Sequence, residues 1–275
     1  MYGKYRWIMF NGIKIGRHSH YLLTSIDGEN DGTSKRNVKE YIDSDGAEIC
    51  DVYYNMRSFK VTGYILTDSV ETAEKRRRKL IEACSLKKGF ILTYFNGVHK
   101  YSAHCRVDEL PYFEKINNKN YKYIINFIMP KFYWEDVNSV TKHISFREDM
   151  IHGELKLPMV FTQLYNYAEV RNLGAIPVYP IFTVSVLSAS DESELIISNQ
   201  TTGKCIGVKC ALDEGEVITF NNNEGTVCSS VKGNIFNKLI KTTDFWELEP
   251  GTNVVNCDTA NVQVKVEYRA LYTGV

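Results

Sequence analysis

The sharpest cluster of charge in the chain is Arg76-Arg77-Arg78-Lys79, which offers four cations to a phosphate or an acidic partner. Glu71 lies four residues before Lys75, and Glu74 lies four residues before Arg78. Acid followed by base at this spacing stabilises an ordinary helix. We therefore interpret the cluster as a solvated helix face or an interface rather than as a phosphate site.

The histidines are the next candidates for chemistry. His18 and His20 would share one face of a strand as half of a metal site, but no carboxylate or cysteine nearby completes it. His99 and His104 would face opposite sides of a strand, and His152-Gly153-Glu154 has no partner. The sequence therefore predicts no metal site and no bound cofactor.

The carboxylates give no catalytic pattern either. Asp27 to Asp31 resembles a calcium loop, but it lacks the alternating oxygen ligands and the closing glutamate. Glu247 and Glu249 do not by themselves support an acid and base pair for glycoside hydrolysis. The chain has no nucleophile elbow, Walker loop or dinucleotide-binding turn. We expect no catalytic residues and a protein that is not an enzyme.

Composition narrows the class further. The chain has 275 residues, with 33 Lys and Arg against 33 Asp and Glu, so it does not hold nucleic acid by bulk electrostatics. Seven scattered cysteines, with a Cys205-x4-Cys210 spacing poor for zinc, indicate free buried thiols. The N-terminus has no apolar core of a signal peptide, and no apolar run is long enough to span a membrane. Such a composition is typical of a soluble protein that associates with its own copies.

The last strand is the clearest structural signal. From Val262 to Arg269 apolar and polar residues alternate strictly, which predicts a half-buried antiparallel strand. Further strands are expected in the same half of the chain, at 181–187, 194–198, 205–210, 216–220 and 226–231. Short strands at this spacing, separated by Gly- and Asn-rich turns, favour a β-sandwich.

The first half reads as a β domain with one helix. Asn11-Gly12 and Asn96-Gly97 each lie between apolar runs and predict hairpins. Residues 27–37 read as a polar, mobile loop, and Ser44-Asp45-Gly46 as a turn. Helical spacing over 69–85 predicts an amphipathic helix, with Asp68 as N-cap and Glu71 completing a capping box.

The expected domains follow from these elements. Residues 1–135 form an N-terminal β domain with one helix, and residues 171–275 form the sandwich. Residues 136–170 mix charges without a clear period and connect the two, with a short edge strand at 155–158.

Motifs in a particular order resemble a known family. They include Phe10-Asn11-Gly12, Arg57-x-Phe59-x-Val61, Asn172-x-Gly174-x-x-Pro177-x-x-Pro180, Pro250-Gly251-x-Asn253 and Val264-x-Val266-x-Tyr268-Arg269. This order and spacing, over nearly the whole chain, is similar to the distal tail proteins of siphovirus-type phages and prophages.

The resemblance implies a fold and a role. The N-terminal domain would carry a projecting hairpin and close six copies into a ring, with a galectin-like sandwich outside it. The ring would sit at the virion tail tip and join the tail tube protein to the hub that carries the tail-associated lysin or fibre. In several members it also holds receptor-binding proteins. DNA would pass through a central channel without specific binding. The hairpin at Asn96-Gly97 and the helix at 69–85 are the expected ring elements.

Two other functions stay open from the sequence. A β-sandwich rich in aromatic residues could be a carbohydrate-binding module for host cell-surface glycans, although the His-x-Asn-x-Arg strand of sugar-binding galectins is missing beside Trp246-Glu247. An enzyme acting on the cell wall would need a converging acid and base pair or a metal site.

Overall fold

The computed structural model describes residues 5–41, 45–146 and 167–275. The chain divides into two compact units. Unit 1 comprises Met1–Val137 together with Tyr272–Val275, and unit 2 comprises Asn138–Leu271. The mainly β fold with one α-helix in the first half of the chain is confirmed among the described residues.

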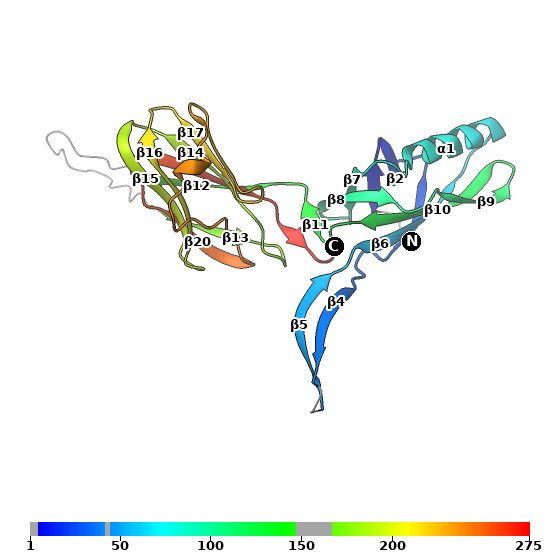
Figure 1. Ribbon diagram of the computed structural model, residues 1–275. Helices are drawn as coiled ribbons and strands as arrows, with labels where there is room; N and C mark the ends of the chain where they lie inside the picture. The colour runs from blue at the N-terminus through cyan, green and yellow to red at the C-terminus, as the bar shows by residue number, and fades with distance from the viewer. Residues whose placement is uncertain (1–4, 42–44, 147–166) are drawn as a thin grey trace, which may run out of the picture. The chain divides into compact units, whose positions relative to one another are not determined.

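Unit 1 is built on a ten-stranded antiparallel sheet whose main path runs β2-β1-β7-β8-β10-β6-β3, with β9, β11 and β22 attached beside it (Figure 1). Its strands are β1 (Trp7–Phe10), β2 (Ile13–Gly16), β3 (Leu22–Asp27), β6 (Arg57–Ile65), β7 (Phe90–Phe95), β8 (Lys100–Val107), β9 (Tyr112–Asn117), β10 (Asn120–Met129), β11 (Trp134–Asp136) and β22 (Leu271–Tyr272).

Buried and exposed side chains alternate along these strands, and the buried ones form the core of unit 1. In β10 every second residue from Tyr121 to Met129 is buried, and in β6 the same holds from Arg57 to Ile65. Gly63 is needed where β6 passes closest to its neighbours, since a Cβ there would lie 2.0 Å from the Leu22 carbonyl oxygen and 2.3 Å from the Tyr123 hydroxyl. The period-2 pattern thus places one apolar face inside.

Helix α1 (Val70–Ala83) covers part of this core through Ala73 and Leu80. The expected N-cap was wrong by one residue. Ser69, not Asp68, has the extended backbone of an N-cap, and its hydroxyl accepts a hydrogen bond from Thr72 N–H at 3.2 Å. The helix therefore starts one residue later than the capping-box spacing indicates.

The two Asn-Gly hairpins differ in their turns. Asn11 and Gly12 both have positive φ, 43° and 75°, and Phe10 pairs with Ile13, as a two-residue type I′ turn requires. At the second hairpin β8 begins only at Lys100, and Asn96 N–H donates to the His99 carbonyl at 3.2 Å. A four-residue loop stands there in place of the predicted two-residue turn.

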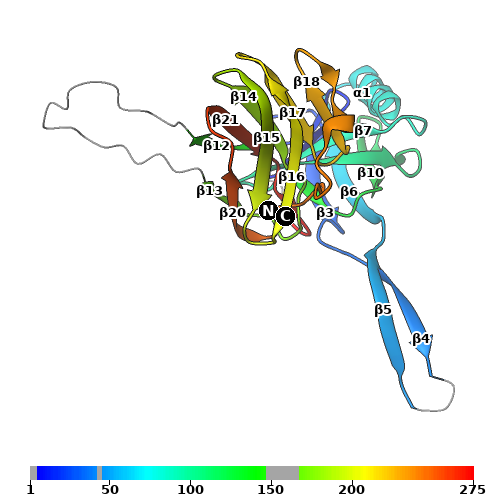
Figure 2. The ribbon, with the colours of Figure 1, turned by 60° about the vertical axis from the view of Figure 1, so that its left-hand side comes forward.

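Unit 2 is a sandwich of two antiparallel sheets, ordered β12-β21-β14-β17-β18-β19 and β13-β20-β15-β16 (Figure 2). Its elements are β12 (Val140–Phe146), β13 (Tyr167–Asn172), β14 (Ile181–Val186), β15 (Ser190–Asn199), β16 (Lys204–Leu212), β17 (Val217–Asn221), β18 (Thr226–Ser229), β19 (Gly233–Asn234), the 3-10 turn η1 (Phe236–Lys238), β20 (Gly251–Cys257) and β21 (Val262–Tyr268).

Strand β21 confirms the strongest expectation from the sequence. Val262, Val264, Val266 and Tyr268 are all buried, and the strand lies between β12 and β14. The expected connection at 136–170 contributes strands at both of its ends, because β12 pairs with β21 and β13 pairs with β20. Its middle, including the expected edge strand at 155–158, lies outside the described residues.

Candidate assembly surface

Strands β4 (Ser34–Glu40) and β5 (Ala47–Tyr54) form a hairpin of unit 1 that pairs with no other described strand. Every residue of β5 is exposed, and so is every residue of β4 except the partly buried Ser34. Both views show the hairpin clear of the other strands of unit 1 (Figures 1 and 2). Part of this hairpin was expected to be a polar loop at 27–37. That expectation was wrong from Ser34 onward, where the backbone is strand.

The register of the hairpin sorts its side chains into two faces. Residues paired across antiparallel strands point the same way, and Arg36 pairs with Val52 while Val38 pairs with Ile49. Ile49 and Val52 are three residues apart and would face opposite sides of a regular strand. A bulge in β5 opposite Asn37 and Val38 restores them to one face.

One face of the hairpin is consequently apolar and the other polar. The apolar face carries Val38, Ala47, Ile49, Val52 and Tyr54, together with the polar residues Ser34, Arg36 and Glu40. The polar face carries Lys35, Asn37, Lys39, Glu48 and Asp51, together with Tyr53.

Most of the apolar face is left exposed by the described residues. Val38, Ile49 and Val52 are 52%, 54% and 57% exposed. A two-stranded hairpin is marginally stable in water, and a contiguous exposed apolar patch marks a contact surface. We therefore identify the apolar face of the hairpin as the candidate assembly surface.

The base of the hairpin is fixed to the body of unit 1. The Tyr54 ring stacks on Phe132, with centroids 4.3 Å apart and planes 9° apart. The Arg57 guanidinium lies 4.2 Å from the centroid of the same Phe132 ring. Asn55 N–H donates to the Thr33 carbonyl oxygen at 2.9 Å. Burial lowers the pKa of Arg57, which is 2% exposed and donates from Nη1 to the Glu29 carbonyl at 2.9 Å.

The hairpin at Asn96-Gly97, expected from the sequence to form the ring, has little unpaired backbone left for a partner. Strand β7 lies between β1 and β8, and β8 lies between β7 and β10, so much of the backbone edge of this hairpin is already paired. What it offers to a partner is its loop, where Val98 is 75% exposed. The Asn96 side chain accepts hydrogen bonds from Val98 and His99 N–H and holds that loop.

The basic cluster on α1 serves local structure. Arg76 donates to the Leu66 carbonyl at 3.0 Å, and Arg77 pairs with Glu74 at 3.0 Å. The Tyr121 hydroxyl donates to Glu74 at 2.5 Å, and this bond together with Arg77 lowers the pKa of the Glu74 carboxyl. The depression along the exposed side of the helix mixes both signs of charge, through Glu71, Glu74, Lys75, Arg78, Lys79 and Glu82. It is not a uniform phosphate-binding stripe.

The histidines and acidic residues singled out from the sequence do not converge. Over the residues that the structure describes, no group of three or more His, Cys, Asp or Glu side chains could hold a metal ion. His18 lies in a turn with φ of 56°, and Glu29 of the calcium-like segment is buried against Arg6 at 3.3 Å. His152 and Glu154 lie outside the described residues.

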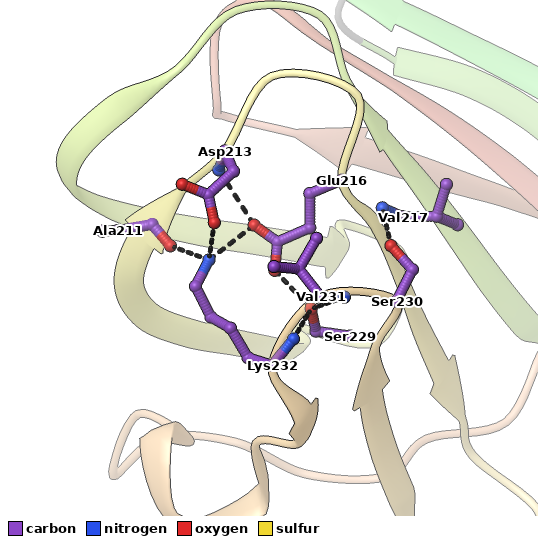
Figure 3. Close-up of polar contacts among 8 residues, drawn as sticks. All are labelled: Ala211, Asp213, Glu216, Val217, Ser229, Ser230, Val231 and Lys232. Atoms are coloured by element: carbon purple, nitrogen blue, oxygen red, sulfur yellow. Dashed lines mark hydrogen bonds and ion pairs between the residues drawn. The ribbon is translucent and has the colours of Figure 1, made fainter.

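A buried carboxylate in unit 2 has several polar partners (Figure 3). Glu216 has a fully buried side chain and pairs with Lys232 Nζ at 2.6 Å. Lys232 also pairs with Asp213 at 2.8 Å and donates to the Ala211 carbonyl at 2.8 Å. Glu216 further accepts from Asp213 N–H at 2.9 Å and from the Ser229 hydroxyl.

These contacts fix the protonation states of the pair. Burial acts to raise the pKa of Glu216, but the hydrogen bonds from Asp213, Lys232 and Ser229 outweigh it and lower that pKa. Burial likewise acts to lower the pKa of Lys232, but its bonds to Asp213 and Glu216 raise it. Both groups stay charged near neutral pH, so the cluster ties two turns together and offers no free acid or base.

Trp246, a candidate sugar contact beside Glu247, belongs to the core of unit 2. Its side chain is 0% exposed and packs on Phe182 with ring centroids 4.9 Å apart. A buried indole cannot stack on a sugar. Glu247 instead raises the pKa of Tyr179 by its charge and hydrogen bond. The exposed aromatics of this unit, among the described residues, are Tyr167, Tyr179 and Phe236.

The cysteines are free thiols, but they are not all buried as expected. Cys84, Cys105 and Cys257 are buried, whereas Cys50 and Cys228 are exposed. No helix in the described part of the chain is long and apolar enough to cross a membrane.

Comparison with protein families gives two matches that together cover most of the chain. Residues 12–129 match the phage tail protein RIFT-related domain, and residues 173–272 match the siphovirus-type tail component, C-terminal domain. No curated protein is a significant match to the sequence.

Comparison with solved structures gives one match that shows the fold of nearly the whole chain. The chain is similar to SPP1 Dit (gp 19.1), described as a paradigm of the hub adsorption apparatus in Gram-positive-infecting phages, with a TM-score of 0.73, 14% identity, and coverage of 97% of this chain and 99% of that chain. It is also similar to a chain of the phage P2 baseplate in its activated conformation with Ca, with a TM-score of 0.49, 10% identity, and coverage of 98% of this chain and 99% of that chain.

Proposed function

Since the chain belongs to the siphovirus-type phage tail proteins and is a structural component of the tail tip, we propose that it closes a hexameric ring through unit 1. The observation that carries this proposal is the exposed, amphipathic hairpin β4–β5. A protein that worked alone would leave this apolar face in water, whereas a ring covers it with the neighbouring copy.

A cyclic ring needs two different patches on each subunit, because each interface joins unlike surfaces. The apolar face of the hairpin supplies one patch. Strand β9 is a candidate for the other, because it pairs only with β10 among the described strands and leaves Tyr112 and Ile116 62% and 52% exposed. An edge strand with exposed apolar residues is ready to accept a partner.

The ring serves as an adaptor in this proposal. It joins the tail tube protein on one side to the hub with the tail-associated lysin or fibre on the other, and unit 2 is available for receptor-binding proteins. DNA passes through its channel without specific binding. In this proposal the protein performs no reaction of its own; among the described residues no group of three or more His, Cys, Asp or Glu side chains could hold a metal ion.

The test compares two variants of the same hairpin. Ile49→Glu with Val52→Glu places charges on the apolar face, whereas the control Asn37→Glu places one on the polar face of the same strands. Solution mass by light scattering and negative-stain imaging would show a hollow six-fold particle for the unaltered chain and for the control. The double variant is expected to be monomeric, because buried carboxylates lose their hydration without a partner.

Two results would count against the proposal. If the chain stays monomeric at every concentration and in the presence of its tail partners, the proposed ring is wrong. An intact ring in the double variant would show that the hairpin does not form it.

A further inference from the structure

Four residues return to unit 1 after the chain has passed through unit 2. This return segment, Tyr272–Val275, packs against the core of unit 1 through its first and last side chains. The Tyr272 ring meets Tyr101 edge to face at 5.4 Å. Val275 N–H donates to Asn30 Oδ1 at 2.8 Å, and the Thr273 carbonyl accepts from Arg57 Nη2.

Arg57 depends on this contact. Its guanidinium is 2% exposed, its Nη1 donates to the Glu29 carbonyl at 2.9 Å, and its Nε has no hydrogen-bond partner among the described residues. Without the Thr273 carbonyl a second nitrogen of a buried cation would lose its acceptor. A buried charge that is short of acceptors is strongly destabilised, so Arg57 holds the return segment in place and is held by it.

The return segment contacts Asn30, Arg57 and Tyr101, and we call these three residues the socket. At Gly274 a Cβ atom would lie 2.9 Å from Asn30 Oδ1, so the Asn30 side chain, which accepts from Val275 N–H, would have to shift. The socket therefore fits a segment with an aromatic residue at its start, a small residue at its third position and backbone groups that can bond to Asn30 and Arg57.

The same arginine is part of the base of the hairpin. Arg57 follows β5 by three residues, and its guanidinium lies on the Phe132 ring, on which Tyr54 of the hairpin also stacks. Phe132 is seated in turn against Gly32, where a Cβ would come within 2.4 Å of the ring. The position of the hairpin is thereby linked, through Phe132 and Arg57, to the occupied socket.

From these contacts we infer that the socket is a binding site for the return segment, and that its occupation sets the base of the hairpin for assembly. The inference rests on the proposed ring. Because the return segment follows unit 2 in the chain, a copy becomes competent to enter the ring only after unit 2 has been made. Partly synthesised chains are thereby kept out of the assembly.

The experiment removes and then restores the segment. A chain that stops after Leu271 is compared with the full chain for ring formation by light scattering and for amide hydrogen exchange. In the truncated chain we expect loss of the ring and exchange faster by about tenfold or more at Asp31 and Asn55, whose N–H groups are bonded around the base of the hairpin. A peptide of residues 271–275, added at about 5 mM to exceed the effective concentration of a short tether, should restore both, and a scrambled peptide should restore neither.

A full-length variant guards against general unfolding of the truncated chain. Gly274→Val weakens the docking of the segment without removing it, since a Cβ there forces Asn30 Oδ1 to shift and that oxygen accepts from Val275 N–H. It should reproduce the faster exchange at Asp31 and Asn55 and leave the amides of unit 2 unchanged.

The outcomes separate the inference from the function on which it rests. A truncated chain and a Gly274→Val chain that form rings and exchange like the full chain would overturn the inference and leave the ring intact. If the full chain forms no ring, the proposed function fails, and the exchange measurement alone decides on the socket. Faster exchange confined to the base of the hairpin then supports the socket, and unchanged exchange overturns it.

Discussion

Replacement of Lys232 by methionine would test how the buried ionic cluster holds the sandwich together. The change removes the cation that lies 2.6 Å from the fully buried carboxylate of Glu216, while the hydrogen bonds from Asp213 N–H and the Ser229 hydroxyl remain. Leaving a buried charge without its partner costs about 3–5 kcal/mol. Lys232 is 30% exposed, so water reaches the vacated position, and we expect a loss of about 3 kcal/mol, at the low end of that range.

The double variant Glu216→Gln with Lys232→Met gives the matched control. Its neutral amide needs no counter-charge, so it should recover about half of the loss or more. Urea unfolding would be followed by hydrogen exchange of the β17 and β18 amides in the full chain. The amides of unit 1 provide an internal reference that should not change.

The stability difference between Lys232→Met and the unaltered protein should also depend on pH, in a direction that follows from the shifted pKa values. The folded-state pKa of Glu216 is lowered, so its stabilisation is present above the ordinary glutamate pKa of about 4.3 and is lost as pH falls through the lowered value. In the variant the buried carboxyl protonates more readily, so the stability gap to the unaltered protein should narrow towards pH 4. The pKa of Lys232 is raised, so its contribution is present below about pH 10.4 and is lost as pH rises through the raised value. A gap below about 1 kcal/mol at pH 7, or one that stays constant down to pH 4, would refute this reasoning.

Three further predictions follow from single contacts. Ser69→Ala should lower the free energy of unfolding of unit 1 by about 1 kcal/mol in thermal or urea denaturation. Asp68→Ala should change it by less than about 0.5 kcal/mol. Equal effects of the two substitutions would contradict Ser69 as the N-cap. Gly63→Ala should destabilise unit 1 by more than about 2 kcal/mol, since its Cβ would overlap the backbone of β3, and an unchanged midpoint would contradict that contact. Alkylation read by mass spectrometry should label Cys50 and Cys228 in the native protein, because they are exposed. It should spare Cys84, Cys105 and Cys257 until the protein unfolds. Burial raises the pKa of Cys84 and of Cys105 to about 12 and that of Cys257 to about 11.

Much of the fold could be predicted from residues that are close in the sequence. Strict alternation identified β21 and its buried face, and Asn11-Gly12 identified a two-residue turn, because both signals depend only on local backbone geometry. The helical spacing of apolar residues likewise predicted helix α1. Its start was missed by one residue because Asp68 and Ser69 are both good caps, and only the folded backbone shows that Ser69 accepts the bond from Thr72 N–H.

The candidate assembly surface could not be predicted from residues that are close in the sequence. Ile49 and Val52 are spaced so that a regular strand would separate them, and β4 is rich in Lys, Arg and Asn, which is typical of a loop. The bulge that unites its apolar residues on one face is visible only in the strand register. Trp246 shows the same limit: the sequence places it beside Glu247, as in half of a galectin sugar site, and only the structure shows that it is fully buried.

The sequence by itself determined the mainly β fold, the helix, the absence of a recognisable catalytic motif and the resemblance to phage tail proteins. Each of these rests on local periodicity or on the order of short motifs. The tertiary structure decided which surfaces are left uncovered and what positions them. Arg57 contacts Glu29 and Thr273, which are 28 and 216 residues away along the chain. Alternation specifies which face of a strand is buried, but it does not specify the partner that lies against that face.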